Sequence, residues 1–511
     1  MFTHATEVRL SEHFVKRSII MGDLSSLRPA AVWRHFFNLC QIPRASGREA
    51  AVRDALSEWA CNRGLCVRGD NRGNLILSKA ATPGFENRPG VVLQGHLDMV
   101  CQKHSGSTHD FGCDPISPVL CDGWVTAPGT TLGADNGIGV ALALAVLEAD
   151  DLEHPALEVL LTVEEESGMH GAMALERDAV QGRLLLNLDA EEWGVLYIGC
   201  AGSVDVVVDA PVLTESAPLG LQSVGVRLSG LVGGHSGIDI HRRRGNAIKL
   251  LAQFLHELAG KGFDFRLVSM MGGTAHNAIA REAEAVLLVG DASALLAEAE
   301  GFVAGLRSQL NDEESRIRID FERISMQDAG NVLTTEAART FLALLHDLPY
   351  GVRQMSEQMP DVVETSNNIG ELRLKKGRFH INMMVRSLDE HGIRTLSDEI
   401  AARFAASRFE NIQVAGAGPV WYPNFGSKLL ALAQDVHRQT FDCKATVHVI
   451  HAGLECGIFH CLWPDMDMIS LGPTIHGAHA PNERVEAASV EHVWRLLAGI
   501  LAAIPEREPE S

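Results

Sequence analysis

The sequence predicts an α/β protein whose main domain, a mixed, largely parallel sheet flanked by helices, is interrupted by an inserted α+β domain. Three observations lead to this prediction. A chain of 511 residues is too long for one compact core. Short apolar strands alternate with helices near both ends of the chain, which favours parallel pairing. The middle of the chain instead holds strands in which apolar and polar residues alternate, as in half-exposed antiparallel sheets.

The main domain is predicted over residues 23–202 and 417–511. Apolar residues at helical spacing predict its helices, and short β-branched or leucine-rich runs predict its buried strands. The expected helices lie at 33–39, 51–60, 137–147, 427–440 and 487–502, and the expected strands at 74–77, 90–94, 157–163, 184–188, 445–450 and 466–471.

The inserted domain is predicted over residues 203–416. Its expected strands lie at 203–209, 224–228, 316–321 and 380–385, and its expected helices at 246–258 and 292–310. Residues 1–22 lack the basic-then-apolar order of a secretory signal. They are expected to form a flexible N-terminal extension, because the residues after Met21 predict the approach to the first helix.

Composition and charge exclude several classes of function. A net charge of −21 argues against a nucleic-acid-binding surface, which needs basic patches. No apolar run approaches the roughly 18 to 20 residues that span a bilayer. The ten cysteines form no Cys-x-x-Cys pair, which fits reduced thiols better than disulfides or a zinc ribbon. We therefore expect a cytoplasmic protein without a nucleic-acid or membrane partner.

Polar side chains follow the predicted buried strands at the points where the strands end. His96 and Asp98 come just after the strand at 90–94, and α/β sheets gather their sites at such carboxyl ends. Imidazole is a good zinc ligand, and a nearby carboxylate commonly orients it. The pair alone is a weak signal, since a histidine is more often an ordinary surface or core residue.

Carboxylates recur at two later points of the chain. The glycine-rich segment 131–139 is expected to leave Asp135 exposed just before a helix, where it could instead simply cap that helix. The run from Glu164 to Glu166 directly follows the strand at 157–163. Mutual repulsion of its carboxylates favours a bound cation, although a solvated turn could also tolerate them.

Two further strands end in the same way, with Asp189 after the strand at 184–188 and His479 in a loop after the strand at 466–471. One sheet would bring all these ends to one edge. Imidazoles and carboxylates without a thiolate suit a pair of zinc, manganese or cobalt ions. Such ions lie roughly 3.5–4 Å apart and are bridged by a carboxylate and a water. A nucleotide loop is rejected because no Gly-x-Gly-x-x-Gly or Gly-Lys-Ser/Thr motif is present.

In combination, these motifs resemble those of the cocatalytic di-zinc metallopeptidases, and most closely the aminoacyl-histidine dipeptidase group (peptidase D). The resemblance runs from about Leu24 to the last predicted helix. It rests on the motifs Gln-Gly-His-Leu-Asp-Met-Val, Gly-Ala-Asp-Asn-Gly-Ile-Gly, Glu-Glu-Ser-Gly-Met, Gly-Gly-His-Ser-Gly and His-Ala-Gly-Leu-Glu-Cys-Gly. It implies that His96 and Asp189 bind one metal, that Glu166 and His479 bind the other, and that Asp135 bridges the two.

The same resemblance assigns two residues beside these ligands. Asp98 would orient His96, and Glu165 would act as general base, taking a proton from the metal-bridging water and returning it to the leaving amine. Glu164 breaks the commonest form of the motif, in which this position is often uncharged, so the register could slide by one residue. The Glu-Glu-x-Gly spacing favours Glu165 and Glu166.

In the inserted domain, the segment Gly233–Gly237 resembles the lid motif of these enzymes. Its His235 would help to stabilise the oxyanion of the tetrahedral intermediate, with Asn277 as a second polar contact. Arg386 would bind the substrate carboxylate, unless it is an ordinary surface arginine. Glu455 would hold the substrate ammonium group.

The resemblance thus implies a metallo-dipeptidase that hydrolyses Xaa-His and other unblocked dipeptides. It further implies a homodimer joined through the lid domain and two Zn²⁺ per subunit, for which Co²⁺ or Mn²⁺ can substitute. Two alternatives stay open: an N-acyl-amino-acid amidohydrolase of the same clan, and a catalytically inactive metal-binding scaffold. An inactive scaffold would be expected to lack the catalytic base or one of the metal ligands, and none of these residues is missing here.

Overall fold

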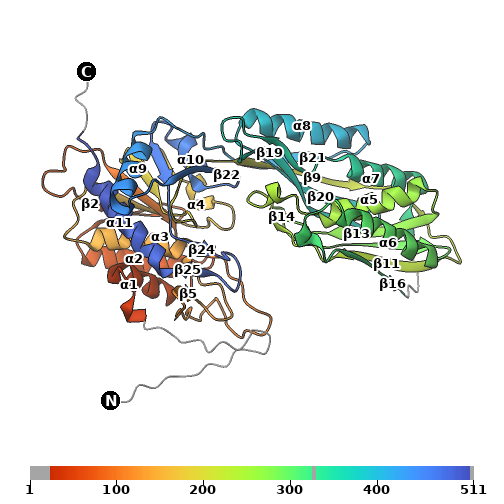
Figure 1. Ribbon diagram of the computed structural model, residues 1–511, viewed down its shortest axis with the longest axis horizontal. Helices are drawn as coiled ribbons and strands as arrows, with labels where there is room; N and C mark the ends of the chain where they lie inside the picture. The colour runs from red at the N-terminus through yellow and green to blue at the C-terminus, as the bar shows by residue number, and fades with distance from the viewer. Residues whose placement is uncertain (1–23, 325–329, 507–511) are drawn as a thin grey trace, which may run out of the picture. The chain divides into compact units, whose positions relative to one another are not determined.

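The computed structural model describes residues 24–324 and 330–506, which form two compact units (Figure 1). The first unit takes in the described parts of residues 1–196, 428–446 and 467–511, and the second those of 197–427 and 447–466. The predicted extension at residues 1–22 lies outside the described residues. Residues 203–416 fall within the second unit, and their assignment to an inserted lid domain stays a prediction.

The first unit combines helices with a mixed sheet. Its helical segments are η1 (Leu24–Ser26), α1 (Ala30–Cys40), α2 (Ala50–Asn62), α3 (Ala134–Glu148), α4 (His170–Met173), α9 (Lys428–Phe441) and α11 (Ala487–Ala503). Its strands are β1 (Cys66–Gly69), β2 (Leu75–Lys79), β3 (Val91–His96), β4 (Val119–Cys121), β5 (Trp124–Thr126), β6 (Leu157–Thr162), β7 (Leu184–Asn187), β23 (Asp467–Ser470), β24 (Ile475–His476) and β25 (Arg484–Glu486). Two more strands, β8 (Val195–Cys200) and β22 (Thr446–Ile450), contain the boundary between the units.

The main sheet of the first unit has the strand order β1-β2-β6-β3-β7-β23. Strand β3 pairs in parallel with β6 and β7, and β23 pairs in parallel with β7. Strands β1 and β2 add antiparallel pairs at one edge. Every residue of β3 is buried, as expected for a parallel strand covered on both faces, and α3 packs against it. The predicted α/β class with a mixed, largely parallel sheet is confirmed.

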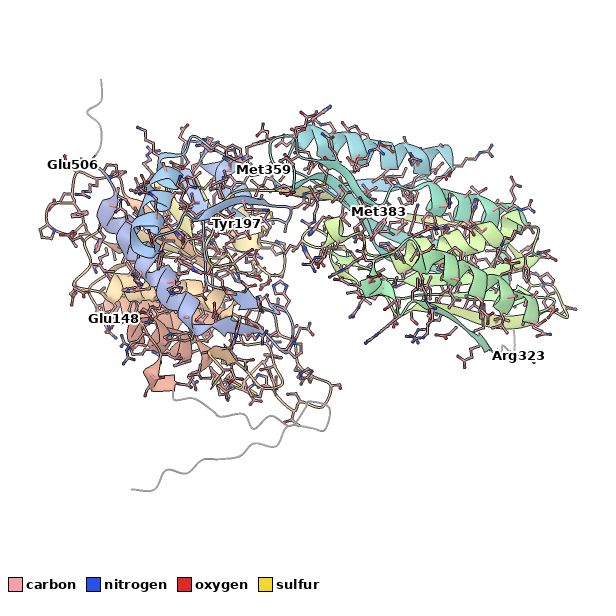
Figure 2. The ribbon with its side chains drawn as sticks, viewed as in Figure 1. Glu148, Tyr197, Arg323, Met359, Met383 and Glu506 are labelled. Carbon is pink, nitrogen blue, oxygen red and sulfur yellow. The ribbon has the colours of Figure 1, made fainter. Side chains whose placement is uncertain are left out.

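Helix α3 is buried almost all round, which explains its glycine- and alanine-rich sequence. At Gly139 a Cβ atom would lie 2.3 Å from the carbonyl oxygen of Leu188, so only glycine lets the helix pass this close to the sheet. The helix begins at Ala134, earlier than the predicted start at residue 137, with an irregular first turn at Asp135. At its other end Glu148 (Figure 2) pairs with Arg34 of α1 at 2.5 Å.

A small sheet in the first unit has the order β24-β25-β5-β4, and all its pairs are antiparallel. Strands β24 and β25 form a hairpin in which Ile475 pairs with Val485 and His476 with Arg484. The loop of this hairpin, residues 477–483, carries His479.

The second unit is α+β. Its helical segments are η2 (Ile240–Arg242), α5 (Ala247–Gly260), α6 (Ser293–Arg307), η3 (Asp312–Glu314), α7 (Thr335–Asp347), α8 (Glu390–Ala406) and α10 (Glu455–Leu462). Its strands are β9 (Gly202–Pro211), β10 (Thr214–Ser216), β11 (Gln222–Ser229), β12 (Gly234–His235), β13 (Phe265–Gly272), β14 (Ala278–Ile279), β15 (Ala283–Val289), β16 (Arg318–Arg323), β17 (Asn331–Leu333), β18 (Gly351–Met355), β19 (Val363–Lys375), β20 (Arg378–Ser387) and β21 (Ile412–Gly418).

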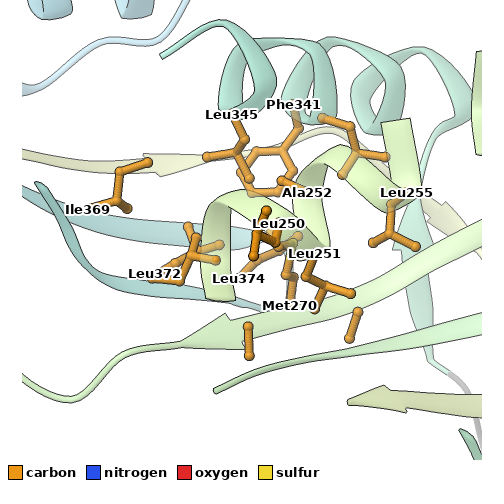
Figure 3. Close-up of a cluster of buried hydrophobic side chains, with 14 of the residues drawn as sticks. Leu250, Leu251, Ala252, Leu255, Met270, Phe341, Leu345, Ile369, Leu372 and Leu374 are labelled. Atoms are coloured by element: carbon orange, nitrogen blue, oxygen red, sulfur yellow. The ribbon is translucent and has the colours of Figure 1, made fainter. Parts of the chain in front are cut away.

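An antiparallel sheet of nine strands forms the centre of the second unit, in the order β16-β11-β15-β13-β19-β20-β9-β21 with β18 beside β19. Helices α5 and α7 pack against each other and on the sheet. Their apolar side chains meet those of β19: Leu251, Phe341 and Leu372 lie in one buried cluster (Figure 3). The alternating pattern of these strands therefore reflects one buried and one exposed face, and the predicted α+β class is confirmed.

Two expectations from composition can be compared with the structure. All ten cysteines are unbridged, in line with the predicted absence of a disulfide framework. Cys40, Cys200 and Cys456 are buried and pack as small apolar groups. Across the described parts of the chain, no helix is both long and apolar enough to cross a membrane.

Candidate metal centre

The five predicted metal ligands all lie in the first unit. His96 is the last residue of β3, while Glu166 and Asp189 follow β6 and β7. Because these three strands are adjacent and parallel, their carboxyl ends meet at one edge of the sheet. The first turn of α3 supplies Asp135, and the loop of the β24–β25 hairpin supplies His479.

Asp135 lies at the centre of this group. Its Oδ1 is 3.1 Å from Nε2 of His96, and its Oδ2 is 3.1 Å from Nε2 of His479. Nε2 of His96 is also 3.4 Å from Oδ1 of Asp189, and Nε2 of His479 is 3.0 Å from Oε2 of Glu166. The structure thus brings all five side chains together as two groups that share Asp135.

The expected exposure of Asp135 is wrong. Only 11% of its side chain is exposed, because His96 and His479 flank the carboxylate on two sides. Gly133 takes the N-cap position of α3, and both carboxylate oxygens of Asp135 contact histidines, so Asp135 is not a simple helix cap. His96 is 1% exposed and His479 53%, so the group opens to solvent on the side of His479.

Asp98 supports this group from behind. Its Oδ1 lies 3.4 Å from Nδ1 of His96 and accepts the N–H of Glu165 at 3.0 Å. Its Oδ2 accepts the N–H of Glu166 at 3.1 Å and the hydroxyl of Ser46 at 2.7 Å. Burial alone would raise the pKa of Asp98, but His96 and these donors outweigh it and lower the pKa to about 2. One ionised carboxylate therefore connects the end of β3 to the loop after β6.

The electrostatics of the group favour a cation. Burial and the Asp135 carboxylate raise the pKa of Glu166 to about 7, and burial raises that of Asp189 to about 6 against the influence of His96. Burial would lower the pKa of His479, but Asp135 and Glu166 outweigh it and raise the pKa to about 11. Positive charge at this position is thus strongly stabilised.

The donor set also fits zinc. It offers two imidazoles and three carboxylates without a thiolate, which is a usual set for this metal. Oε1 of Glu166 and Oδ1 of Asp189 are buried and, among the described residues, have no hydrogen-bond partner. Ligand atoms of His96, Asp135 and Glu166 lie within 4.8 Å of one another, as a metal site requires. A bound metal would therefore give these two oxygens, on Glu166 and Asp189, the partner that they lack.

The three consecutive glutamates after β6 differ in their surroundings. Glu164 pairs with Arg72 and has a left-handed backbone with φ of 53°. Glu166 instead faces His479, and Glu165 between them is half-buried. Glu166 therefore belongs to the group around Asp135 and Glu164 does not, while the assignment of Glu165 stays a prediction.

His235 lies in the second unit, on β12. Its Nδ1 accepts the N–H groups of Gly237 at 3.2 Å and Ile238 at 3.1 Å. An imidazole that accepts at Nδ1 carries its proton at Nε2 when neutral, so this ring is fixed as an Nε2 donor. Asp239 also helps to fix His235, because its Oδ2 accepts the main-chain N–H of His235 at 2.9 Å.

The other three predicted residues also lie in the second unit. Asn277 is exposed, and its main-chain carbonyl oxygen accepts the N–H of Ser236 at 2.8 Å. Arg386, on β20, is only 5% exposed, so the alternative of a surface arginine is wrong: the strand is covered on both faces at this point. Glu455 is fully buried at the start of α10.

Two buried charged residues of the first unit were missed by sequence analysis. Glu483 is 2% exposed and Arg44 is 3% exposed, and both contact the loop that leads into Asp135. The position of Glu483, four residues after His479 in the same loop, was the one available signal.

Comparison with known proteins identifies the family. Residues 92–503 match peptidase family M20/M25/M40, and the chain belongs to this family. It is similar to the cytosol non-specific dipeptidase of Escherichia coli (strain K12), with 40% identity over 492 residues, which is 95% of this chain and 100% of that protein. The crystal structure of aminoacylhistidine dipeptidase from Vibrio alginolyticus matches with a TM-score of 0.79 and 39% identity, covering 95% of this chain and 99% of that one.

A more distant match shows the fold alone. Aminopeptidase PepT from Bacillus cereus ATCC 10987 has 15% identity and a TM-score of 0.54, and the match covers 94% of this chain and 99% of that one. The predicted resemblance to aminoacyl-histidine dipeptidases is thereby confirmed, and so is the predicted enzyme class, a hydrolase of the peptidase type.

Proposed function

We propose that this chain is a zinc-dependent dipeptidase that hydrolyses Xaa-His and other unblocked dipeptides. The observation that carries this proposal is the position of Asp135, which offers one carboxylate oxygen to each of two histidines from distant parts of the chain. The full-length similarity to two dipeptidases supports the substrate class.

In this proposal the centre holds two Zn²⁺ ions, and Co²⁺ or Mn²⁺ can replace them. His96 and Asp189 would hold one ion, Glu166 and His479 would hold the other, and Asp135 would contribute to both. Bound ions of this kind polarise a substrate carbonyl and make a water molecule more acidic. The protein residues then have to move protons and hold the substrate.

Glu165 is assigned the proton transfers. It is half-buried and adjacent to Glu166, and the hydrogen bond from its N–H to Asp98 fixes its main chain. As general base its carboxylate takes a proton from the attacking water, and as general acid it returns the proton to the leaving nitrogen. Asp98 keeps His96 oriented throughout.

The second unit is assigned substrate recognition. His235, fixed as an Nε2 donor, suits an oxyanion, and Asn277 is a second polar contact. Arg386 suits the substrate carboxylate because it is a buried cation. Glu455 suits the substrate ammonium group. Recognition of both charged ends would explain a preference for dipeptides over longer chains.

We further propose a cytoplasmic homodimer joined through the lid domain, residues 203–416. The unbridged state of all ten cysteines fits a reducing compartment. Light scattering after size-exclusion chromatography tests the dimer: a monomeric mass at micromolar concentration would exclude it.

Metal analysis combined with a substrate panel tests the proposed function. We expect about two zinc ions per chain and hydrolysis of Xaa-His dipeptides. Blocked N-acetyl amino acids should be poor substrates. The reverse preference would identify an N-acyl-amino-acid amidohydrolase, and two bound ions without hydrolysis of either class would identify a scaffold.

A further inference from the structure

Glu483 contacts four consecutive main-chain N–H groups. Its Oε2 accepts those of Leu132 at 2.7 Å and Gly133 at 2.9 Å, and its Oε1 accepts those of Ala134 at 2.7 Å and Asp135 at 3.2 Å. Leu132 and Gly133 directly precede α3, and Ala134 and Asp135 are its first residues, where main-chain N–H donors have no partner within the helix. A carboxylate from a distant loop thus holds the main chain of the segment that presents Asp135.

Arg44 contacts the carbonyl groups of two of the same segments. Its Nη1 donates to the carbonyl oxygens of Leu97 and Asp98, each at 2.9 Å, and its Nη2 donates to that of Gly133 at 2.5 Å. Leu97 directly follows His96. The guanidinium group therefore connects the end of β3 to the loop before Asp135.

Both contacts are made in the protein interior, where a charged group is costly unless polar groups replace its hydration. The main chain of two ligand-bearing loops supplies these groups. Glu483 also belongs to the loop of His479, and its own carbonyl oxygen accepts the hydroxyl of Thr126 at 2.8 Å. Three loops that carry candidate ligands are therefore held together by one anion and one cation.

We propose that Glu483 and Arg44 are positioning residues for metal binding, which hold the 132–135 loop so that Asp135 reaches both His96 and His479. This inference rests on the proposed metal centre and adds to it two residues that touch neither metal nor substrate. Asp135 must present both carboxylate oxygens at once, so a small displacement of its loop weakens its contacts on both sides.

Zinc titration of the metal-free protein against a competing chelator tests the proposal. Glu483→Gln keeps the size of the side chain but offers an amide group to two of the four N–H donors. Arg44→Met keeps much of the side-chain stem but leaves the carbonyl oxygens of Leu97, Asp98 and Gly133 without their donor. Each variant is expected to bind zinc about 10- to 100-fold more weakly, as is usual when groups that support metal ligands are removed.

Two matched control variants separate positioning from general stability. Glu314 is 1% exposed and accepts the N–H groups of Val232 at 2.9 Å and Gly245 at 3.0 Å in the second unit. Arg88 donates to the carbonyl oxygens of Ala502 and Ile504, away from the ligand loops. Glu314→Gln and Arg88→Met are expected to lower the melting temperature while leaving the zinc affinity unchanged.

Three results would overturn the proposal. Zinc affinity equal to that of the unmodified protein in both Glu483→Gln and Arg44→Met would show that the loop does not need them. Equal losses in the controls would show a general effect of stability. If neither Glu483→Gln nor Arg44→Met folds while both controls do, then Glu483 and Arg44 stabilise the fold as a whole and are not specific to metal binding. If only one of the two variants folds, the zinc affinity of that variant tests the proposal. Failure of the unmodified protein to bind two zinc ions would instead reject the proposed function.

Discussion

Around Asp135 in the first unit, buried carboxylates outnumber imidazoles, whereas in the second unit two buried bases, Arg386 and His451, influence each other. Burial lowers the pKa of Arg386 to about 10 against the influence of Asp205. Burial, Arg386 and His235 together lower the pKa of His451 to about 3. His451 also shares a hydrogen bond of 2.8 Å with Ser366.

The difference indicates what each unit would bind under the proposed function. A cluster in which acids repel one another is stabilised by cations, and a cluster in which bases lie together is stabilised by an anion. A dipeptidase needs both properties, since it uses metal ions and must hold the substrate carboxylate. The predictions below test this division of roles.

The largest effect is expected for Glu165→Ala. If Glu165 transfers the proton, kcat/KM for a Xaa-His dipeptide should fall by about 10²- to 10⁴-fold, with the zinc content unchanged. Glu164→Ala is the matched control, because the neighbouring carboxylate pairs with Arg72. Activity near that of the unmodified protein in Glu165→Ala, or a comparable loss in Glu164→Ala, would move the role of base elsewhere.

Asp135→Asn should weaken zinc binding more than the roughly 10- to 100-fold typical of residues that only support ligands. The asparagine side chain has the same shape as that of aspartate, but it lacks the negative charge that two metal ions would share. Zinc content after dialysis and chelator titration measure this effect. A variant that retains two tightly bound zinc ions would show that Asp135 is not the bridge.

Arg386→Met should raise KM by about 10- to 100-fold, since a hydrogen bond to a charged group contributes about 1.5–3 kcal/mol. Arg378→Met on the same strand is the control, because that residue is exposed and pairs with Asp209. A C-terminally amidated dipeptide should show little difference between the unmodified protein and Arg386→Met. If both substrates lose equally, Arg386 does not recognise the carboxylate.

The smallest effect concerns stability below neutral pH. His451 stays neutral in the folded protein down to a pKa of about 3, whereas in the unfolded chain it takes up a proton near its ordinary pKa of about 6.5. The unfolded state thus binds more protons between these values, and stability falls as the pH drops. Between pH 6.5 and pH 5 the loss attributable to His451 is at most about 2 kcal/mol.

Urea unfolding of His451→Gln at pH 7.5 and pH 5 measures this contribution. The variant should lose less stability than the unmodified protein over this interval. The control variant His391→Gln, at an exposed position on α8, should lose as much stability over this pH interval as the unmodified protein does. An identical pH dependence in all three proteins would show that His451 does not titrate in this way.

Much of the first unit was predictable because its signals are local. His96 and Asp189 stand directly after apolar runs, and a run of this kind predicts both a buried strand and the edge at which it ends. Parallel pairing then brings these residues together without further information. The exposure of Asp135 was mispredicted because it depends on His479, which approaches from the other end of the chain.

The second unit was less predictable because its longest strand contains buried polar residues. Strand β19 includes Asn367 and Asn368, and their partners are Pro349, Ala278 and Asn246 from other segments. A polar run of this kind does not indicate a buried strand until those partners are known. The contacts of Glu483 and Arg44 were hidden for a similar reason, since main-chain groups carry no residue-specific pattern.

The chain order of the candidate ligands has a consequence for protein synthesis. His96 emerges from the ribosome before the second unit, whereas His479 belongs to a hairpin that follows the whole of the second unit. Most of the first unit can therefore be synthesised, and the second completed, before the last ligand is available. A nascent chain that ends before residue 479 lacks the complete ligand set, so the proposed hydrolytic activity would arise only after residue 479 has been translated.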